Sequence, residues 1–267
     1  MSSAGRPVSA MIRIGSIAVS NLTWPEATRR VEELINSEGT DYILTPNVDH
    51  IVQAESDPYL KRIYADCPLV LADGMPLIWA ARFLGTPLKE KISGSDFLVE
   101  FCPVAARKGY RLFFLGGKDD AGEISATLLK KRFPGLQVVG TCSPSIGFEK
   151  SPADNQRVIE AITAAAPDLL FVGLGTPKQE KWIYENRHLH RVPLSFPVGA
   201  GFDFISGKSR RAPVWMRQSG LEWLWRLALE PGRMFERYLV RDLQFFPIIL
   251  RQKRQGAPRF GQADHQL

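Results

Sequence analysis

Two short stretches decide the fold of this chain: Tyr42-Ile43-Leu44-Thr45-Pro46-Asn47 and Leu69-Val70-Leu71-Ala72-Asp73-Gly74. In each, a hydrophobic run typical of a buried strand ends in small and polar residues. In an open α/β sheet, ligands bind just beyond the carboxyl ends of the strands. The two stretches therefore predict a crevice with a hydroxyl, an amide and one carboxylate, in which Asp73 could act as a general base. An equally good interpretation of Asp73-Gly74 alone is a simple turn.

The rest of the chain alternates between strand and helix patterns. Thr23-Trp24-Pro25-Glu26 combines a capping box with an early proline, which is typical of a helix start. The alternation predicts an α/β fold, a Rossmann-like and mostly parallel sheet with helices on both faces. The expected strands are residues 41–45, 69–72, 111–115, 136–140, 168–172 and 194–198, and the expected helices are residues 24–37, 76–84, 95–108, 121–132 and 151–165, with further helices starting near 57 and 178.

The composition narrows the class of protein. Hydrophobic residues make up 45% of the 267 positions, enough for a sizeable core, which excludes wholesale disorder. The three cysteines form no CxxC pair, so a reducing compartment fits better than a disulfide framework or a zinc site. Residues 1–20 lack the apolar core of a signal peptide, and no run approaches the ~20 apolar residues of a membrane span. We expect a cytoplasmic protein that does not cross the membrane.

Positive charge is concentrated in the last quarter of the chain. Residues 207–267 hold 12 Lys/Arg and five Asp/Glu, whereas residues 1–206 hold 22 and 23. The α/β pattern also ends here, so we expect an α/β nucleotide-sugar-binding catalytic domain at 1–206, a basic amphipathic helical appendage at 207–254 and a disordered tail at 255–267.

The appendage combines basic and aromatic side chains at helical spacing. Arg233, Arg237 and Arg241 follow one another at i+4 and predict one basic ridge, with Trp225 and Phe235 nearby. Such helices are typical of elements that lie on an anionic membrane surface. The alternative is a pair of helices that pack on the core with a solvated basic face, and nucleic-acid binding is the weakest interpretation.

Two junctions of strand, glycines and helix could receive a phosphate. They are Gly116-Gly117 after residues 111–115, and Gly173-Leu174-Gly175 after residues 168–172. Glycines let the backbone approach a diphosphate, and a following helix offers free N–H groups. Neither junction is a Walker A motif or a GxGxxG, so each could equally serve only a tight turn.

Several other chemistries lack their signature. There is no GxSxG for a serine hydrolase, and the His188/His190 pair has no neighbouring carboxylate or cysteine cluster for a metal. No Asp-x-Asp occurs, the spacing with which many nucleotide-sugar enzymes hold a divalent ion. We therefore expect no cofactor and no metal requirement.

An ordered set of motifs resembles one known family. The set is Thr45-Pro46-Asn47, Ala72-Asp73-Gly74, Gly94-Ser95-Asp96, Gly116-Gly117, Gly173-Leu174-Gly175-Thr176-Pro177-Lys178-Gln179-Glu180, Gly199-Ala200-Gly201-Phe202-Asp203, Arg211-Ala212-Pro213 and a tail with Arg226, Arg233 and Arg237. It resembles the WecG/TagA/CpsF glycosyltransferases over roughly residues 10–245.

The resemblance implies an inverting transferase that moves a sugar from a UDP-sugar donor to an undecaprenyl-diphosphate-linked sugar. This reaction belongs to cell-surface or exopolysaccharide biosynthesis at the inner face of the cell membrane. By position, Asp73 matches the family's proposed base, Thr45 and Asn47 its polar pair, and Gln179 a substrate-contacting glutamine. Lys91 stands where relatives usually carry an arginine, and it keeps the charge without the guanidinium fork. The remaining substrate-binding candidates are Gly116, Gly117, Gly173, Gly175, Asp203, Arg211, Arg226, Arg233 and Arg237.

These residues define one mechanism and two rivals. Asp73 would accept the proton of the attacking hydroxyl, and Lys91 would offset the charge on the departing UDP. An oxidoreductase would show a GxGxxG after the first strand, which is missing. A membrane-associated nucleotide-binding scaffold without turnover stays open as the alternative. So do the donor sugar, the acceptor sugar and a possible homo-oligomer.

Overall fold

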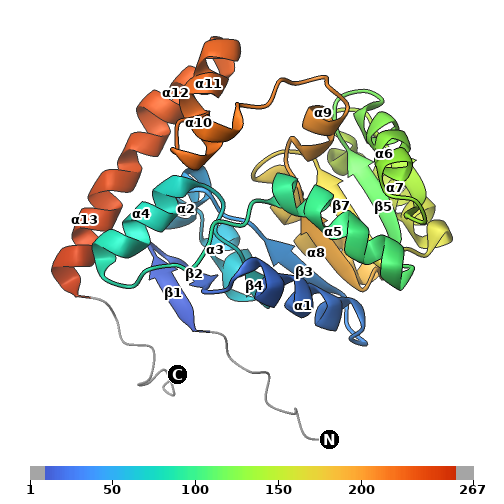
Figure 1. Ribbon diagram of the computed structural model, residues 1–267, viewed down its shortest axis with the longest axis horizontal. Helices are drawn as coiled ribbons and strands as arrows, with labels where there is room; N and C mark the ends of the chain where they lie inside the picture. Colours follow the sequence, from blue (N-terminus) through green and yellow to red (C-terminus); the bar gives the residue numbers. More distant parts are fainter. Residues whose placement is uncertain (1–9, 257–267) are drawn as a thin grey trace, which may run out of the picture.

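A six-stranded parallel sheet forms the centre of the molecule (Figure 1). This computed structural model describes residues 10–256, apart from the side chain of Arg233. The strands lie in the order β4-β3-β8-β7-β5-β6. Their bounds are β3 Asp41–Leu44, β4 Leu69–Val70, β5 Arg111–Gly116, β6 Gln137–Cys142, β7 Leu169–Gly173 and β8 Leu194–Pro197. The sheet was predicted strand by strand, because each strand is a local hydrophobic run that helices cover on both sides.

Helices cover both faces of the sheet, and each face has its own hydrophobic cluster. One cluster consists of residues from α1, α5, α6, α9 and the sheet, and includes Phe97, Phe114 and Phe202. The other cluster contains residues from α2, α3, α4, α7, α8 and α13, and includes Ile51 and Trp182. The predicted α/β class is therefore confirmed. The helix bounds are α1 Trp24–Ile35, α2 Val48–Ser56, α3 Pro58–Ala65, α4 Met75–Leu84, α5 Gly94–Lys108, α6 Ala121–Arg132, η1 Phe148–Lys150, α7 Pro152–Ala165, α8 Lys178–His190 and α9 Gly201–Ile205.

Some elements were not predicted from the sequence, among them the short helices η1 and α9. A β-hairpin, β1 Met11–Ile14 and β2 Ile17–Ser20, pairs antiparallel around Gly15, which has a φ of +58°. Helix α2 begins directly after Asn47, which is its N-cap. We expected a helix only from Asp57, because Asp57-Pro58 is the stronger start signal; it caps α3, while α2 ends at Ser56.

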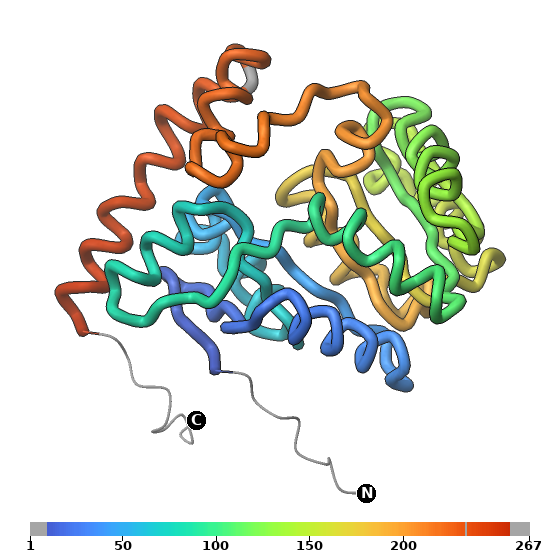
Figure 2. The backbone as a smooth tube through the Cα atoms, in the orientation of Figure 1, coloured from blue at the N-terminus to red at the C-terminus, as the bar shows by residue number. Residues whose placement is uncertain are grey.

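The C-terminal appendage packs along one side of the α/β body (Figures 1 and 2). It consists of α10 Val214–Gln218, α11 Glu222–Leu229, α12 Pro231–Glu236, a π-helical turn η2 Arg237–Arg241, η3 Asp242–Gln244 and α13 Phe245–Gln255. Phe245 and Ile249 are each only 6% exposed and belong to the core cluster that includes α2 and α4. The side chain of Gln252 bonds to both the amide of Gly15 and the carbonyl of Arg13, at 2.8 Å each. The appendage is thus tied to the body by apolar and polar contacts.

The predicted tail at 255–267 lies outside the described residues except at its start. Gln255 is the last residue of α13, so the helix runs one residue further than the predicted appendage. The division into a domain at 1–206 and an appendage at 207–254 stays a prediction.

Candidate active site

The two strand ends within residues 42–47 and 69–74 lie side by side. Strands β3 and β4 pair in parallel, with Leu44 opposite Val70. The amide of Asp73 donates to the carbonyl of Pro46 at 2.9 Å, which joins the loop after β4 to the loop after β3. Gly74, with a φ of +102°, then starts α4. The expected juxtaposition of Thr45, Asn47 and Asp73 at one edge of the sheet is therefore found, and Asp73-Gly74 is a turn as well.

The environment of Asp73 raises its pKa to about 6, mainly because burial disfavours the charged carboxylate. The nearby carboxylate of Glu222 adds to this shift, whereas the cations Lys91 and Arg226 oppose it. A carboxylate with such a pKa is ionised at neutral pH and can still accept a proton readily. These are the properties of a general base.

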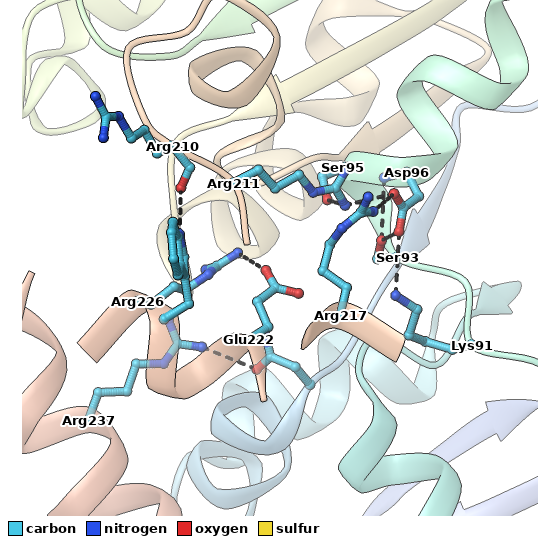
Figure 3. A network of polar contacts seen from close by, with 12 residues as sticks. Lys91, Ser93, Ser95, Asp96, Arg210, Arg211, Arg217, Glu222, Arg226 and Arg237 are labelled. Atoms are coloured by element: carbon cyan, nitrogen blue, oxygen red, sulfur yellow. Dashed lines mark hydrogen bonds and ion pairs between the residues drawn. The ribbon is translucent and has the colours of Figure 1, made fainter. Parts of the chain in front are cut away.

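Lys91 belongs to a cluster of cations around Asp96 (Figure 3). Asp96 lies 3.5 Å from Lys91, 2.7 Å from Arg211 and 3.1 Å from Arg217. Burial alone would raise the pKa of Asp96, but a hydrogen bond from Ser93 and the charge of Arg211 outweigh it and hold the pKa low. One carboxylate therefore faces three cations, and the cluster keeps an excess of positive charge beside Asp73.

A groove of about 700 Å³ borders this cluster. Lys91, Asp96 and Arg217 line one part of it, and residues of α1 such as Trp24 and Arg29 line another. Arg217, which the sequence analysis did not single out, thus lies both at Asp96 and at the groove.

Arg226 approaches Asp73 from α11. Its guanidinium donates to Glu222 at 2.8 Å (Figure 3). It also lies over the ring of Phe204, at 5.4 Å from the centroid. The charge of Glu222 raises the pKa of Asp73, and the charge of Arg226 lowers it. The appendage therefore contributes one anion and one cation to the surroundings of Asp73.

Arg237 also reaches the site, from η2. Its Nη2 lies 3.4 Å from Asn47 Oδ1, and its Nε lies 3.2 Å from Asp49 Oδ2. Arg241 Nε contacts the other oxygen of Asp49 at 2.9 Å, and Asp49 is only 3% exposed. The expected ridge of arginines toward a membrane is therefore wrong for Arg237 and Arg241, which face the body. The side chain of Arg233, the third member, lies outside the described part of the chain.

Gln179 lies below the surface at the start of α8. It is 4% exposed, its Nε2 donates to Glu180 Oε1 at 2.8 Å, and its Oε1 accepts from the amide of Gly199 at 3.3 Å. Both ends of this amide are engaged within the protein. Gln179 thus connects the loop after β7 with the loop after β8.

The glycine junctions differ from one another. The amide of Gly117 donates to the carbonyl of Gly173 at 2.9 Å, and a Cβ on Gly116 would lie 2.4 Å from that oxygen. Close packing between the two loops therefore requires Gly116 and explains Gly173, around which Phe202 leaves no room for a side chain. At Gly175, with a φ of +78°, a Cβ would meet nothing within 4 Å. Among the four glycines of the two junctions, Gly175 is the one with open space beside its backbone.

Asp203 connects α9 to the first glycine junction. It is 8% exposed, and its Oδ1 accepts from the amide of Lys118 at 2.8 Å. Asp119 and Asp120, at the start of α6, pair with Lys208 at 3.3 and 2.5 Å. Acidic side chains therefore lie beside the helix start that could have received a phosphate.

Sequence reasoning missed His50, Asp49 and Glu222, which contact predicted site residues, and Arg217, which contacts Asp96. His50 is 3% exposed and bonds to Asn47. A signal for it existed, because His50 is the third residue of the helix that Asn47 caps, where a side chain can reach back to the cap. Asp96, the partner of Arg217, lies 121 positions away in the sequence, so no local pattern indicates it. Glu222 and Arg226 are four residues apart on one helix, and this spacing was a local signal for their pairing.

Residues 10–256 contain no group of three or more His, Cys, Asp or Glu that could hold a metal ion. None of the helices in this range combines the length and the apolar character that a membrane span needs.

Comparison with known proteins identifies the family. The sequence model of the Glycosyl transferase WecG/TagA/CpsF family matches residues 12–259, so the chain belongs to this family of glycosyltransferases. The resemblance noted in the sequence is therefore confirmed.

Three relatives bear the name N-acetylglucosaminyldiphosphoundecaprenol N-acetyl-beta-D-mannosaminyltransferase. The protein of Bacillus spizizenii (strain ATCC 23059 / NRRL B-14472 / W23) is 30% identical over 216 residues, 81% of each chain. That of Bacillus subtilis (strain 168) is 33% identical over 191 residues, 72% of each chain. That of Staphylococcus aureus (strain MRSA252) is 24% identical over 231 residues, which cover 86% of this chain and 89% of the relative.

Proposed function

We propose that this glycosyltransferase transfers a sugar, with inversion, from a UDP-sugar to a sugar linked to undecaprenyl diphosphate. One observation carries the proposal: a carboxylate with a pKa raised to about 6, Asp73, lies at the strand ends with Lys91 and Arg226 close by. The names of the relatives support the lipid-linked acceptor. We further propose that the product enters cell-surface polysaccharide.

The proposed reaction is one in-line displacement. The acceptor hydroxyl oxygen forms a bond to the anomeric carbon while the bond from that carbon to the β-phosphate oxygen of UDP breaks. Asp73 takes the proton of the hydroxyl, an effect typically worth about 10²–10⁴-fold. Lys91 and Arg226 stabilise the negative charge that UDP carries away. This excess of fixed cations supports metal-independent transfer.

The remaining residues would orient the two substrates. Thr45 and Asn47 would bond to sugar hydroxyls at the edge of the sheet, and the open backbone at Gly175 would receive the donor diphosphate. Gln179 would support the site from inside the protein, because its side chain is only 4% exposed. Arg211 and Arg237 would hold the diphosphate of the acceptor, since both extend from the appendage side of the site toward it.

We propose that the protein docks on the cytoplasmic face of the membrane through an exposed apolar stripe on the appendage. The stripe consists of Phe235, Leu239, Leu243, Phe246 and Leu250, which are 38–64% exposed and recur every three or four residues. Trp79 and Phe83 of α4 are also about half exposed, and Lys253 lies over the ring of Phe83 at 5.6 Å. A row of exposed apolar side chains of this kind favours an interface with lipid or protein. Arg251, Lys253 and Arg254 are exposed next to the stripe and would meet anionic headgroups.

A transfer assay tests the proposed function. Purified full-length protein is mixed with a synthetic prenyl-diphosphate N-acetylglucosamine and a panel of UDP-sugars, starting with UDP-N-acetylmannosamine because of the activity named for the relatives. We expect a disaccharide on the lipid and one equivalent of UDP with at least one donor. A scaffold without turnover predicts no product with any donor.

A further inference from the structure

A buried histidine connects the two loops that flank the site. His50 lies in the first turn of α2 and is 3% exposed. Its Nδ1 accepts from the backbone amide of Asn47 at 3.2 Å, and its Nε2 lies 3.1 Å from Glu180 Oε1 on α8. Since a carboxylate only accepts hydrogen bonds, Nε2–H is the donor to Glu180. Asn47 and Glu180 are thus held by opposite ends of one imidazole ring.

The connection continues beyond Glu180. Glu180 is 1% exposed, and the same oxygen that meets His50 also accepts from Gln179 Nε2 at 2.8 Å. Gln179 in turn accepts from the amide of Gly199, which follows β8. A continuous buried chain of hydrogen bonds therefore runs from the loop after β3, through α2 and α8, to the loop after β8.

This chain of hydrogen bonds lowers the stability of the fold, which is unexpected if its role is purely structural. The second oxygen of Glu180 is buried and has no hydrogen-bond partner within the described residues. A buried polar group without a partner lowers stability, and an apolar pair of similar size would avoid the cost. Such costs are found where an arrangement of polar groups serves binding or chemistry.

We propose that His50 and Glu180 are positioning residues that fix Asn47 by its backbone amide and, through Gln179, the loop at Gly199. The side-chain amide of an asparagine has an acceptor end and a donor end. Arg237 donates to Oδ1 of Asn47 at 3.4 Å, so this oxygen faces the protein and the NH₂ group is left for a substrate oxygen. The inference rests on the proposed function, since it assigns Asn47 to the sugar.

A double-mutant cycle tests this inference in the transfer assay described above. The variants are Asn47→Ala, His50→Ala and the two combined, with His188→Ala as the matched control, because His188 is exposed on α8 and contacts Thr40. If His50 acts through Asn47, each single variant lowers kcat/KM by about 10- to 100-fold, the size expected for a misplaced substrate contact. The kcat/KM of the double variant is then at most about threefold lower than that of the less active single variant, because the two residues act as one unit.

A conservative change at Glu180 separates positioning from stability. Glu180→Gln keeps an oxygen for His50 Nε2–H and should retain most of the transfer rate, whereas Glu180→Leu should lose as much as His50→Ala. Melting temperatures are measured for all variants, and His50→Gln replaces His50→Ala if the latter does not fold. Losses that multiply in the double variant, or that follow the melting temperature alone, would overturn the inference. If the wild-type protein transfers no sugar, the proposed function fails instead, so the two failures are distinguishable.

Discussion

Replacing Asp49 by Asn tests how firmly the appendage is held against the body. Asp49 is 3% exposed and lies 3.2 Å from Arg237 and 2.9 Å from Arg241. At an effective dielectric constant of about 20, each contact has a Coulomb energy of roughly 5 kcal/mol before desolvation is subtracted. The isosteric Asn removes this attraction and leaves two cations facing a neutral amide.

The net loss is smaller than this Coulomb energy. Removing one partner of a buried pair typically costs about 3–5 kcal/mol. The side chain of Arg241 is 44% exposed, so it can turn to water, and Arg237 keeps Asp242 at 3.9 Å. We therefore expect Asp49→Asn to lower the free energy of unfolding by about 2–3 kcal/mol, or the melting temperature by about 4–10 °C for a chain of this size.

The assay is urea unfolding, with Arg251→Gln as a control for the loss of an exposed arginine of the same appendage. Arg241→Gln should cost less than Asp49→Asn, and the combined variant should cost little more than Asp49→Asn alone. A change below about 0.5 kcal/mol for Asp49→Asn, which is the usual size for surface positions, would refute the proposed attachment.

Three further predictions concern the site and the stripe. The pKa of Asp73 is raised to about 6, and a general base acts in its ionised form, so kcat/KM should be level above about pH 7 and fall as the pH drops through about 6. A rate that is flat down to pH 5 would contradict this. Transfer should survive excess EDTA; activity that EDTA abolishes and Mn²⁺ restores would refute metal independence. Phe246→Glu with Leu250→Glu should abolish co-sedimentation with anionic vesicles. Reversing the charges of Arg251, Lys253 and Arg254 should weaken vesicle binding by about 1 kcal/mol for each positive charge removed, with a larger effect at low salt than at high salt. Unchanged sedimentation of both variants would refute docking through the stripe.

The sheet and most of its helices could be predicted because their signals are local. Each strand is a short hydrophobic run, and capping residues such as Thr23 and Ser151 mark helix starts. The position of Asp73 followed from the same signals, since the end of a strand fixes which edge of the sheet a residue occupies. Helix α2 was missed because its start signal, Asn47, had been interpreted only as a site residue.

The contacts of the appendage could not be predicted in this way. Helical spacing shows which residues share a face, but both faces of α13 are apolar: Phe245 and Ile249 are buried, whereas Phe246 and Leu250 are exposed. Which face meets the body is decided by contacts with residues far away in the sequence, such as Gly15, which bonds to Gln252 of α13. The pair of His50 and Glu180, separated by 130 positions, was hidden for the same reason.

Replacing Asp73 by Asn gives the most direct test of the account. The amide has nearly the same shape as the carboxylate but cannot accept the proton of the acceptor hydroxyl at neutral pH. We predict that Asp73→Asn keeps the melting temperature and the affinity for UDP, while single-turnover transfer to prenyl-diphosphate N-acetylglucosamine slows by at least ~100-fold. Near-normal transfer by this variant would contradict the central claim that Asp73 is the catalytic base.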